Sequence, residues 1–237
     1  MRDLLSVLLI LSISIPVLSC RDRGFDNPYD PGRSDTAYEI SRVLNLEFIA
    51  PLDLSFTAEA LWICDGGNQI FAVDYNSGQT IRTLNPGRPV IGIAHAEGDL
   101  WLAFPGTRQL NRVNALNGET VRQLFLPRGE PGRLDYHQGR LYVADAAANV
   151  VLVVDPLSGN VEKTLNHQGF SLDGLAHDGH YTWTLDSGQE KLFRQADDGT
   201  PVQNYVAPAR NLSGLAWGAD SLWCGDRGGR IFRLRFQ

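Results

Sequence analysis

Short runs of apolar, β-branched and aromatic residues recur along the chain, and turn residues separate them. Residues 133–165 show the pattern most clearly, with the runs LDY, LYVAD, VVLVVD and VEKTL separated by HQGR, AAAN and PLSG. Runs of this length between Gly, Pro, Asn and Asp are typical of β-strands joined by tight turns. The segment therefore predicts a four-stranded antiparallel meander.

The same unit repeats along most of the chain. The first apolar residue of each unit serves as an anchor, and successive anchors stand 39 to 41 residues apart: Leu54, Ile93, Leu134, Leu175 and Leu215. A period near 40 residues with four strands per unit is the pattern of propeller blades, which cover one another's faces in a ring. The sequence therefore predicts an all-β fold, a five-bladed β-propeller with four antiparallel strands per blade, over residues 39–237.

The fifth unit ends before a fourth strand, because the sequence stops at Gln237. Near the front, SRVLN at residues 41–45 matches IRTLN at residues 81–85, the fourth strand of the first unit. Its distance to the anchor Leu54 equals the corresponding distance in later units. We expect this N-terminal strand to complete the last blade and to leave no open sheet edge where the ring closes.

The second strand of each unit is apolar on both alternations, as expected for strands between two neighbouring sheets. One aromatic column runs through these strands: Trp62, Trp101, Tyr142, Trp183 and Trp223. Since every unit has an aromatic residue there, the column favours a buried core over a ligand box. Aspartates end four of the five strands: Asp65, Asp145, Asp186 and Asp226. We expect them to cap the following turn, and a ligand role is the alternative.

Residues that break a repeat need a reason other than the fold. Before the anchor, Asp53 and Arg133 replace the glycine of the other units, and Asp173 and Ser213 occupy the preceding column. First strands begin where second strands end, so these side chains should converge on one mouth of the central channel. The predicted ligand-binding residues are Asp53, Arg133, Asp173, Ser213, Arg88 and Arg210. The alternative is that Arg133 and Asp173 only pair with each other across the channel.

Other chemistry-bearing residues indicate structure. His95 and His177 share a column with aromatic residues, which favours packing over metal binding. Cys64 and Cys224 are one register apart on neighbouring blades, so we expect two buried thiols rather than a disulfide. The sequence has no nucleophile elbow, phosphate loop or zinc-protease motif. We therefore predict no catalytic residue, no metal ligand and no cofactor.

Residues 1–19 have the features of a signal peptide, with Arg2 before an apolar run that is too short to span a bilayer. The residues VLSC, which end at Cys20, resemble a bacterial lipobox, and an ordinary cleaved signal is the alternative. The resemblance implies lipidation of Cys20, and the following Arg21 favours the outer membrane. Residues 20–38 are rich in Pro, Gly and charge, which predicts a lipid-anchored linker.

Composition narrows the possible partners. The chain has a formal net charge of −6, and removal of residues 1–19 leaves that charge unchanged because it takes away one Arg and one Asp. An acidic chain with scattered arginines does not fit a nucleic-acid binder.

The phrase G-L-A-[HW]-x-x-x-x-[LT]-W-x-x-D, at residues 174–186 and 214–226, resembles the NHL, gluconolactonase and glutamine-cyclotransferase-like β-propellers. The resemblance covers residues 39–237 and implies blade structure without specifying an activity. Gluconolactonase-type enzymes hold a divalent metal with Glu, Asn and Asp, and the predicted mouth has no glutamate. Plant-type glutamine cyclotransferases are five-bladed and use a glutamate in a phrase like LFESTG, where this chain has LWICDG.

Taken with the predicted lipid anchor, the sequence favours a membrane-tethered, extracytoplasmic module of the bacterial cell envelope. We expect it to bind or scaffold a protein, a peptide or a glycan, and not nucleic acid. The alternative is an enzyme, a metal-dependent lactonase or hydrolase or a glutamine-cyclotransferase-like protein. That enzyme would use the cluster of Asp53, Arg133 and Asp173.

Overall fold

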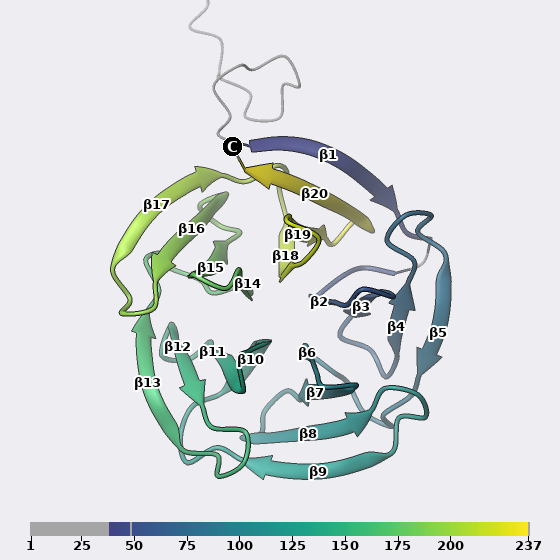
Figure 1. Ribbon diagram of the computed structural model, residues 1–237, viewed down its shortest axis with the longest axis vertical. Helices are drawn as coiled ribbons and strands as arrows, with labels where there is room; N and C mark the ends of the chain where they lie inside the picture. Colours follow the sequence, from purple (N-terminus) through teal and green to yellow (C-terminus); the bar gives the residue numbers. More distant parts are fainter. Residues whose placement is uncertain (1–37, 48, 237) are drawn as a thin grey trace, which may run out of the picture.

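Five four-stranded antiparallel sheets stand around a central axis in a computed structural model, which describes residues 38–47 and 49–236 (Figure 1). The predicted all-β five-bladed propeller is therefore confirmed. The predicted signal peptide, the lipidation site Cys20 and the linker up to residue 37 lie outside the described residues. Within the described part of the chain, no helix has the length and apolar character needed to cross a bilayer.

Each of the first four blades consists of four consecutive strands, and the first strand is the innermost and the fourth the outermost (Figure 1). Blade 1 consists of β2 (Asp53–Phe56), β3 (Leu61–Cys64), β4 (Ile70–Val73) and β5 (Thr80–Leu84). Blade 2 consists of β6 (Gly92–Ala96), β7 (Asp99–Ala103), β8 (Gln109–Asn114) and β9 (Thr120–Phe125). Blade 3 consists of β10 (Pro131–His137), β11 (Arg140–Asp145), β12 (Val150–Val154) and β13 (Val161–Asn166). Blade 4 consists of β14 (Gly174–His177), β15 (Tyr181–Asp186), β16 (Lys191–Ala196) and β17 (Pro201–Val206).

Blade 5 joins the two ends of the ring. It contains β18 (Leu212–Trp217), β19 (Leu222–Asp226) and β20 (Arg230–Phe236), and its outer strand is β1 (Tyr38–Asn45). β1 pairs antiparallel with β20 from Tyr38 opposite Phe236 to Asn45 opposite Arg230, with one irregularity near Ile40. The predicted closure by the N-terminal strand is confirmed, and the strand begins one residue earlier than expected.

The hydrophobic core lies in the seams between neighbouring blades. Trp101 of blade 2 packs in one cluster with Leu134 of blade 3, and Trp223 of blade 5 packs with Leu54 of blade 1. All five residues of the aromatic column are buried, so its predicted core role is confirmed. Burial of each such side chain contributes about 1.5–3 kcal/mol.

Polar side chains add contacts at predicted places. The four strand-ending aspartates each accept a backbone N–H from the following turn, as expected for turn caps: Asp65 from Gly67, Asp145 from Ala148, Asp186 from Gln189 and Asp226 from Gly228. Cys64 and Cys224 are buried free thiols, also as predicted.

Arginines on three outer strands hold the next blade. Arg42 and Arg82 donate to the carbonyl oxygens of Asn76 and Ala115 at 2.5 and 2.9 Å, and Arg122 donates to the carbonyl of Leu157. The accepting residues lie in the turn between the third and fourth strands of the neighbouring blade. These bonds, which have a charged donor, fasten the outer rim of the ring across three seams.

Candidate functional site

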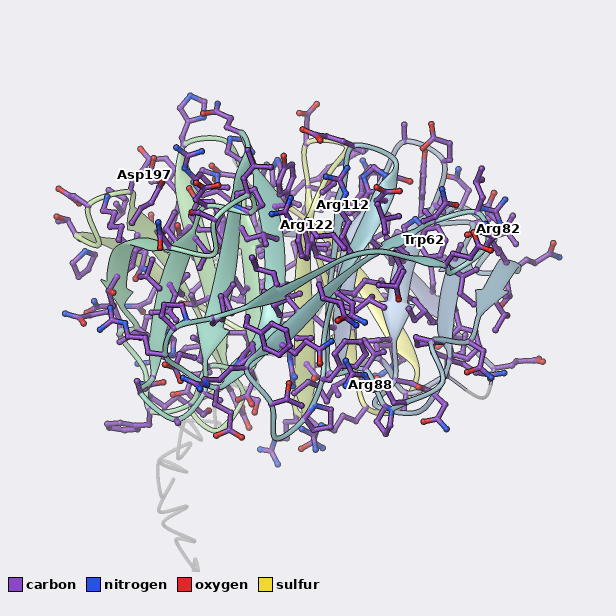
Figure 2. All side chains as sticks on the ribbon, turned by 90° about the horizontal axis from the view of Figure 1, so that it is seen from below. Trp62, Arg82, Arg88, Arg112, Arg122 and Asp197 are labelled. Atoms are coloured by element: carbon purple, nitrogen blue, oxygen red, sulfur yellow. The ribbon has the colours of Figure 1, made fainter. Side chains whose placement is uncertain are left out.

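The ring has two faces, which are distinguished in a side view (Figure 2). Arg88 lies toward one face, and Arg82, Arg112 and Asp197 lie toward the other. The Arg88 face carries the loops between blades and the turns after the second strands. The Asp197 face carries the other two turns of each blade. The predicted channel mouth belongs to the Arg88 face.

Asp53 lies fully buried on the channel axis. Its Oδ2 accepts the backbone N–H groups of Ile93 in blade 2 and Leu134 in blade 3, at 2.9 and 3.0 Å. Its Oδ1 is buried and has no hydrogen-bond partner among the described residues. Burial raises the pKa of Asp53 to about 8, although the Arg133 charge and the N–H donors oppose the shift.

The raised pKa has a consequence for stability. An unfolded aspartate loses its proton near pH 4, whereas folded Asp53 keeps its proton until about pH 8. Between these values the folded ring binds more protons than the unfolded chain does. The contribution of Asp53 to the free energy of unfolding therefore falls as the pH rises from about 4 to about 8.

Arg133 connects the remaining blades. Its Nε donates to the carbonyl oxygen of Asp173 in the loop before β14 of blade 4 at 3.0 Å, and its Nη1 donates to the carbonyl oxygen of Ile91 before blade 2 at 2.9 Å. Its Nη2 lies 3.4 Å from Oγ of Ser213 in blade 5. Together, Asp53 and Arg133 contact all five blades, and we call this pair the axial lock.

The Asp173 carboxylate has other partners. Its Oδ2 accepts the backbone N–H of Ser187 at 3.0 Å and the hydroxyls of Ser171 and Ser187, both at 2.7 Å. The side-chain pair of Arg133 and Asp173, the alternative that the sequence left open, does not form. Three short bonds satisfy the carboxylate, and the guanidinium bonds the backbone carbonyl of the same residue instead.

Arg88 and Arg210 stay apart from the axis. The Arg88 guanidinium lies over the Phe104 ring, 3.5 Å from its centroid. Arg210 pairs with Glu190 at 3.1 Å, and 74% of its side chain is exposed. The structure thus brings Asp53, Arg133, Asp173 and Ser213 together and places the two other arginines in peripheral contacts. Ligand binding by this set stays a prediction.

The metal that the gluconolactonase resemblance implies does not fit these residues. Among residues 38–47 and 49–236, no group of three or more His, Cys, Asp or Glu side chains could hold a metal ion. The charged residue next to the Asp53 carboxyl at the axis is Arg133, and its permanent positive charge repels a divalent ion. The channel mouth therefore does not suit a divalent metal ion.

A hollow of about 280 Å³ opens between blades 1 and 2, and we call it the blade 1–2 hollow. Its apolar lining consists of Ala60, Trp62, Ala72, Ile81, Ala115 and Leu116. Ile81 and Leu116 are 57% and 70% exposed, although both are large apolar residues. Exposed apolar side chains around a concavity are typical of a binding surface rather than of a solvated turn.

The polar residues of the hollow are Thr57, Glu59, Arg82 and His95. Thr57 bonds within its own turn, and Arg82 bonds the Ala115 carbonyl across the seam. The Glu59 carboxylate makes no hydrogen bond or ion pair among the described residues. Burial lowers the pKa of His95, which favours the neutral ring. Arg82 is the cation of the lining, and its guanidinium donates to the Ala115 carbonyl rather than to Glu59.

The repeat pattern of the sequence does not reveal this hollow. Leu116 stands at the tip of the turn NALNG, but Leu157 stands at the same place in the turn DPLSG and does not line the hollow. The concavity itself depends on the small residues Ala60, Ala72 and Ala115 meeting across two blades, which only the folded ring shows.

Comparison with known proteins supports the fold of the chain but assigns it to no family. No family model and no curated protein matches the chain. Among solved structures, glutaminyl cyclase from Myxococcus xanthus has a TM-score of 0.73 at 16% identity, over 84% of this chain and 96% of that one.

Virginiamycin B lyase from Staphylococcus aureus has a TM-score of 0.53 at 14% identity, over 79% of this chain and 67% of that one. A streptogramin B lyase has a TM-score of 0.53 at 13% identity, over 83% of this chain and 97% of that one. At these identities the likeness concerns the fold alone, and it supports the assignment of the chain as a β-propeller.

Proposed function

We propose that the chain is a membrane-tethered, extracytoplasmic module that binds a polypeptide segment in the blade 1–2 hollow. The observation that carries this proposal is the apolar hollow itself, with Ile81 and Leu116 exposed at its edge. Single exposed apolar side chains are common on protein surfaces, whereas a contiguous group of them around a concavity is typical of a binding site.

The dimensions and the charge of the hollow favour a polypeptide ligand. Its volume of about 280 Å³ lies just below the range for ligand pockets, roughly 300–1,000 Å³. It therefore fits one large apolar side chain better than a cofactor. The lining has one charge of each sign, Glu59 and Arg82, and the Arg82 guanidinium is already bonded to the Ala115 carbonyl. The exposed Glu59 at the rim is therefore the charge that favours a Lys or Arg next to that side chain, because opposite charges steer and orient a partner.

The channel mouth is a weaker candidate for the ligand site, although the sequence favoured it. Asp53 is closed off from solvent, and Arg133 already donates to three acceptors. A ligand there would have to replace bonds that hold the blades together. The enzymatic alternative built on Asp53, Arg133 and Asp173 loses support for the same reason.

The hollow is tested with two matched variants. Peptides selected from a random display library on the purified ring provide the ligands, and their affinity is measured by fluorescence anisotropy. Leu116→Arg is expected to weaken binding at least tenfold, because it places a charge at the apolar edge and repels a basic peptide. Leu157→Arg changes the same turn position of blade 3, which is 69% exposed and does not line the hollow.

Both variants change exposed side chains, so both should fold and unfold like the unmodified ring. Peptides that bind Leu116→Arg as tightly as Leu157→Arg would show that the hollow is not the binding site. Selection of peptides without a shared apolar and basic pattern would remove the argument from Glu59.

The tether rests on the sequence around Cys20 and on the linker that follows. Acyl chains contribute about 0.8 kcal/mol for each buried methylene, so a lipidated cysteine holds a protein on a membrane without an apolar helix. Mass spectrometry of the mature chain from bacterial membranes should find an N-terminal Cys20 with attached acyl groups. A Cys20→Ser chain should leave the membrane fraction, and a mature chain without lipid would exclude the tether but not the hollow.

A further inference from the structure

The residue that faces the aromatic column from the third strand differs between blades. Three tryptophans of the column have an arginine directly opposite: Trp101 and Arg112, Trp183 and Arg194, and Trp223 and Arg233. In blade 3 the facing pair is Tyr142 and Val153. In blade 1 the facing pair is Trp62 and Ala72, and both residues line the blade 1–2 hollow. Blade 1 therefore presents a tryptophan without the arginine that accompanies it in blades 2, 4 and 5.

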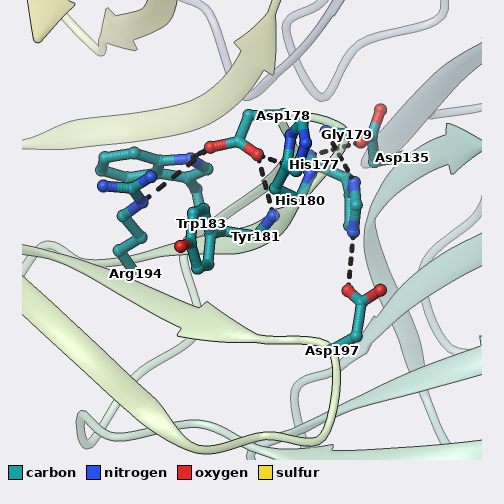
Figure 3. A network of polar contacts seen from close by, with 9 residues as sticks. All are labelled: Asp135, His177, Asp178, Gly179, His180, Tyr181, Trp183, Arg194 and Asp197. Carbon is teal, nitrogen blue, oxygen red and sulfur yellow. Dashed lines mark hydrogen bonds and ion pairs between the residues drawn. The ribbon is translucent and has the colours of Figure 1, made fainter.

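Blade 4 shows how such an arginine fills its seam (Figure 3). The Arg194 guanidinium lies 5.4 Å from the centroid of the Trp183 ring and 3.8 Å from that of the Tyr181 ring. Its Nε lies 4.0 Å from Oδ2 of Asp178, which belongs to the turn between the first and second strands. Aromatic rings attract a cation to their faces, and a nearby carboxylate balances its charge. Rings and carboxylate together hold one guanidinium.

Blades 5 and 2 also give their arginines an acceptor. The Arg233 guanidinium lies 5.2 Å from the centroid of the Trp223 ring. Its Nε donates to Oγ of Ser221 at 2.9 Å, in the turn between the first and second strands. In blade 2, Nε of Arg112 donates to Oδ2 of Asp99 at 2.7 Å, at the start of the second strand. The acceptor thus comes from the same short segment of the repeat in all three blades.

Blade 1 has every part of this arrangement except the arginine. Trp62 is 5% exposed, whereas the other three tryptophans of the column are 1% exposed or less, so its ring can be reached from the hollow. The turn between the first and second strands supplies the exposed carboxylate of Glu59. Ala72 is too short to cover the ring. The blade 1–2 hollow therefore lies where blades 2, 4 and 5 hold a guanidinium of their own.

Arg82 does not prevent a second guanidinium from entering the hollow. It lies opposite Ala72 on the fourth strand, and it donates to the Ala115 carbonyl at 2.9 Å. In blades 2 and 5 the third and fourth strands carry two facing arginines at these positions: Arg112 and Arg122, and Arg233 and Arg42. In both blades the fourth-strand arginine donates to a carbonyl of the next blade, as Arg82 does. The ring thus accommodates two neighbouring guanidinium groups at the equivalent places.

We propose that the polypeptide ligand of the blade 1–2 hollow inserts an arginine, whose guanidinium lies over the Trp62 ring with Glu59 as its counter-charge. This inference rests on the proposed function, because the arginine belongs to the same ligand. It selects arginine from the two basic residues that Glu59 alone favours. A guanidinium is planar, weakly hydrated and able to stack on an aromatic ring, whereas the lysine ammonium is a compact and strongly hydrated charge. The apolar neighbour of the arginine then rests against Ile81 and Leu116 at the edge of the hollow.

The first test fills the hollow from within the chain. Ala72→Arg restores the residue of blades 2, 4 and 5, and Ala72→Met adds a long side chain without a charge. In thermal unfolding, Ala72→Arg is expected to melt about 2–4 °C above Ala72→Met, because its guanidinium meets Trp62 and Glu59. The difference should shrink when both variants also carry Glu59→Gln. An Ala72→Arg chain that melts no higher than Ala72→Met would show that the hollow does not suit a guanidinium, and would overturn the proposal.

The second test leaves the hollow unmodified and uses two small probes, N-acetylarginine amide and N-acetyllysine amide. The ¹⁵N-labelled chain of residues 20–237 reports binding through the indole N–H signal of Trp62, which is assigned by its loss in Trp62→Phe. The arginine probe is expected to shift this signal saturably, with a dissociation constant roughly tenfold below that of the lysine probe. Ala72→Arg should abolish the response, because its own guanidinium then occupies the site.

The outcomes separate this inference from the proposed function. Equal affinities of the two probes, or no response to either, would overturn the choice of arginine and leave the apolar hollow in place. Selected peptides that bind the hollow without an arginine would have the same meaning. Peptides that bind Leu116→Arg as tightly as Leu157→Arg, together with a response to the arginine probe, would instead overturn the polypeptide site and leave a site for a guanidinium.

Discussion

Removal of residues 38–45 is expected to abolish the cooperative unfolding of the ring. β1 contributes seven residue pairs to the sheet of blade 5 and buries Tyr38 and Leu44. Two such side chains contribute about 1.5–3 kcal/mol each, and each backbone bond adds about 0.5–1.5 kcal/mol. The loss is then on the order of 5–10 kcal/mol, comparable to the whole stability of a typical domain.

Urea unfolding followed by near-ultraviolet circular dichroism measures this effect. A chain of residues 38–237 is the control, and it should retain a single sharp transition because it keeps every strand. A synthetic peptide of residues 38–45, added to the shortened chain, should restore part of the signal. Equal midpoints for the two chains would contradict the closure.

The axial lock gives the second large effect. Arg133→Met keeps a long apolar stem but removes three hydrogen bonds that link blades 2, 4 and 5 to blade 3. Bonds to a charged group contribute about 1.5–3 kcal/mol each, and the bond to Ser213 is long. We expect the free energy of unfolding to fall by roughly 3–6 kcal/mol, measured by urea denaturation at pH 7.

Arg128→Ala is the matched control, since Arg128 is exposed and makes one side-chain contact, with Thr164. It should change stability by less than about 0.5 kcal/mol. A second measurement follows stability against pH. The unmodified ring should lose stability as the pH rises from about 4 to about 8. Asp53→Asn should reduce this slope without removing it, because burial also raises the pKa of Asp135, to about 7. A slope that Asp53→Asn leaves unchanged would show that Asp53 does not hold a proton in the folded ring.

The sequence was sufficient to predict the architecture because the five repeat units can be compared with one another within one chain. Five anchors set the phase of every blade, and the match of residues 41–45 to residues 81–85 located the closing strand. Turn caps and the aromatic column followed from columns of similar residues. These features depend on local pattern, which a single chain displays when it contains the pattern five times.

Comparison of the repeat units could not predict the hydrogen-bond partners of Asp53 and Arg133. The sequence placed Asp53 and Arg133 at one mouth, but their partners come from segments about 40 to 80 positions away. An irregularity in the register of β10 between Pro131 and Leu134 changes the local geometry beside Arg133. Column arguments do not contain such shifts in the backbone.

Blade 4 has a polar pair, Thr182 opposite Gln195, that the repeat also makes visible. Thr182 and Gln195 break their columns as clearly as Arg133 breaks its own, so the sequence held the signal. In the other blades two apolar residues face each other at these positions of the second and third strands, so the polar pair of blade 4 is visible in the sequence alone.

Because β1 and β20 belong to the same sheet, the chain termini could lie in a different blade without loss of any strand pairing. Tyr38 and Phe236 lie opposite each other, so a short peptide could join the two extremities of the ring. Breaking the backbone in any loop between blades would then give a circular permutant with every strand still paired. In such a permutant all five blades would be continuous in sequence, and no blade would need a strand from the other end of the chain.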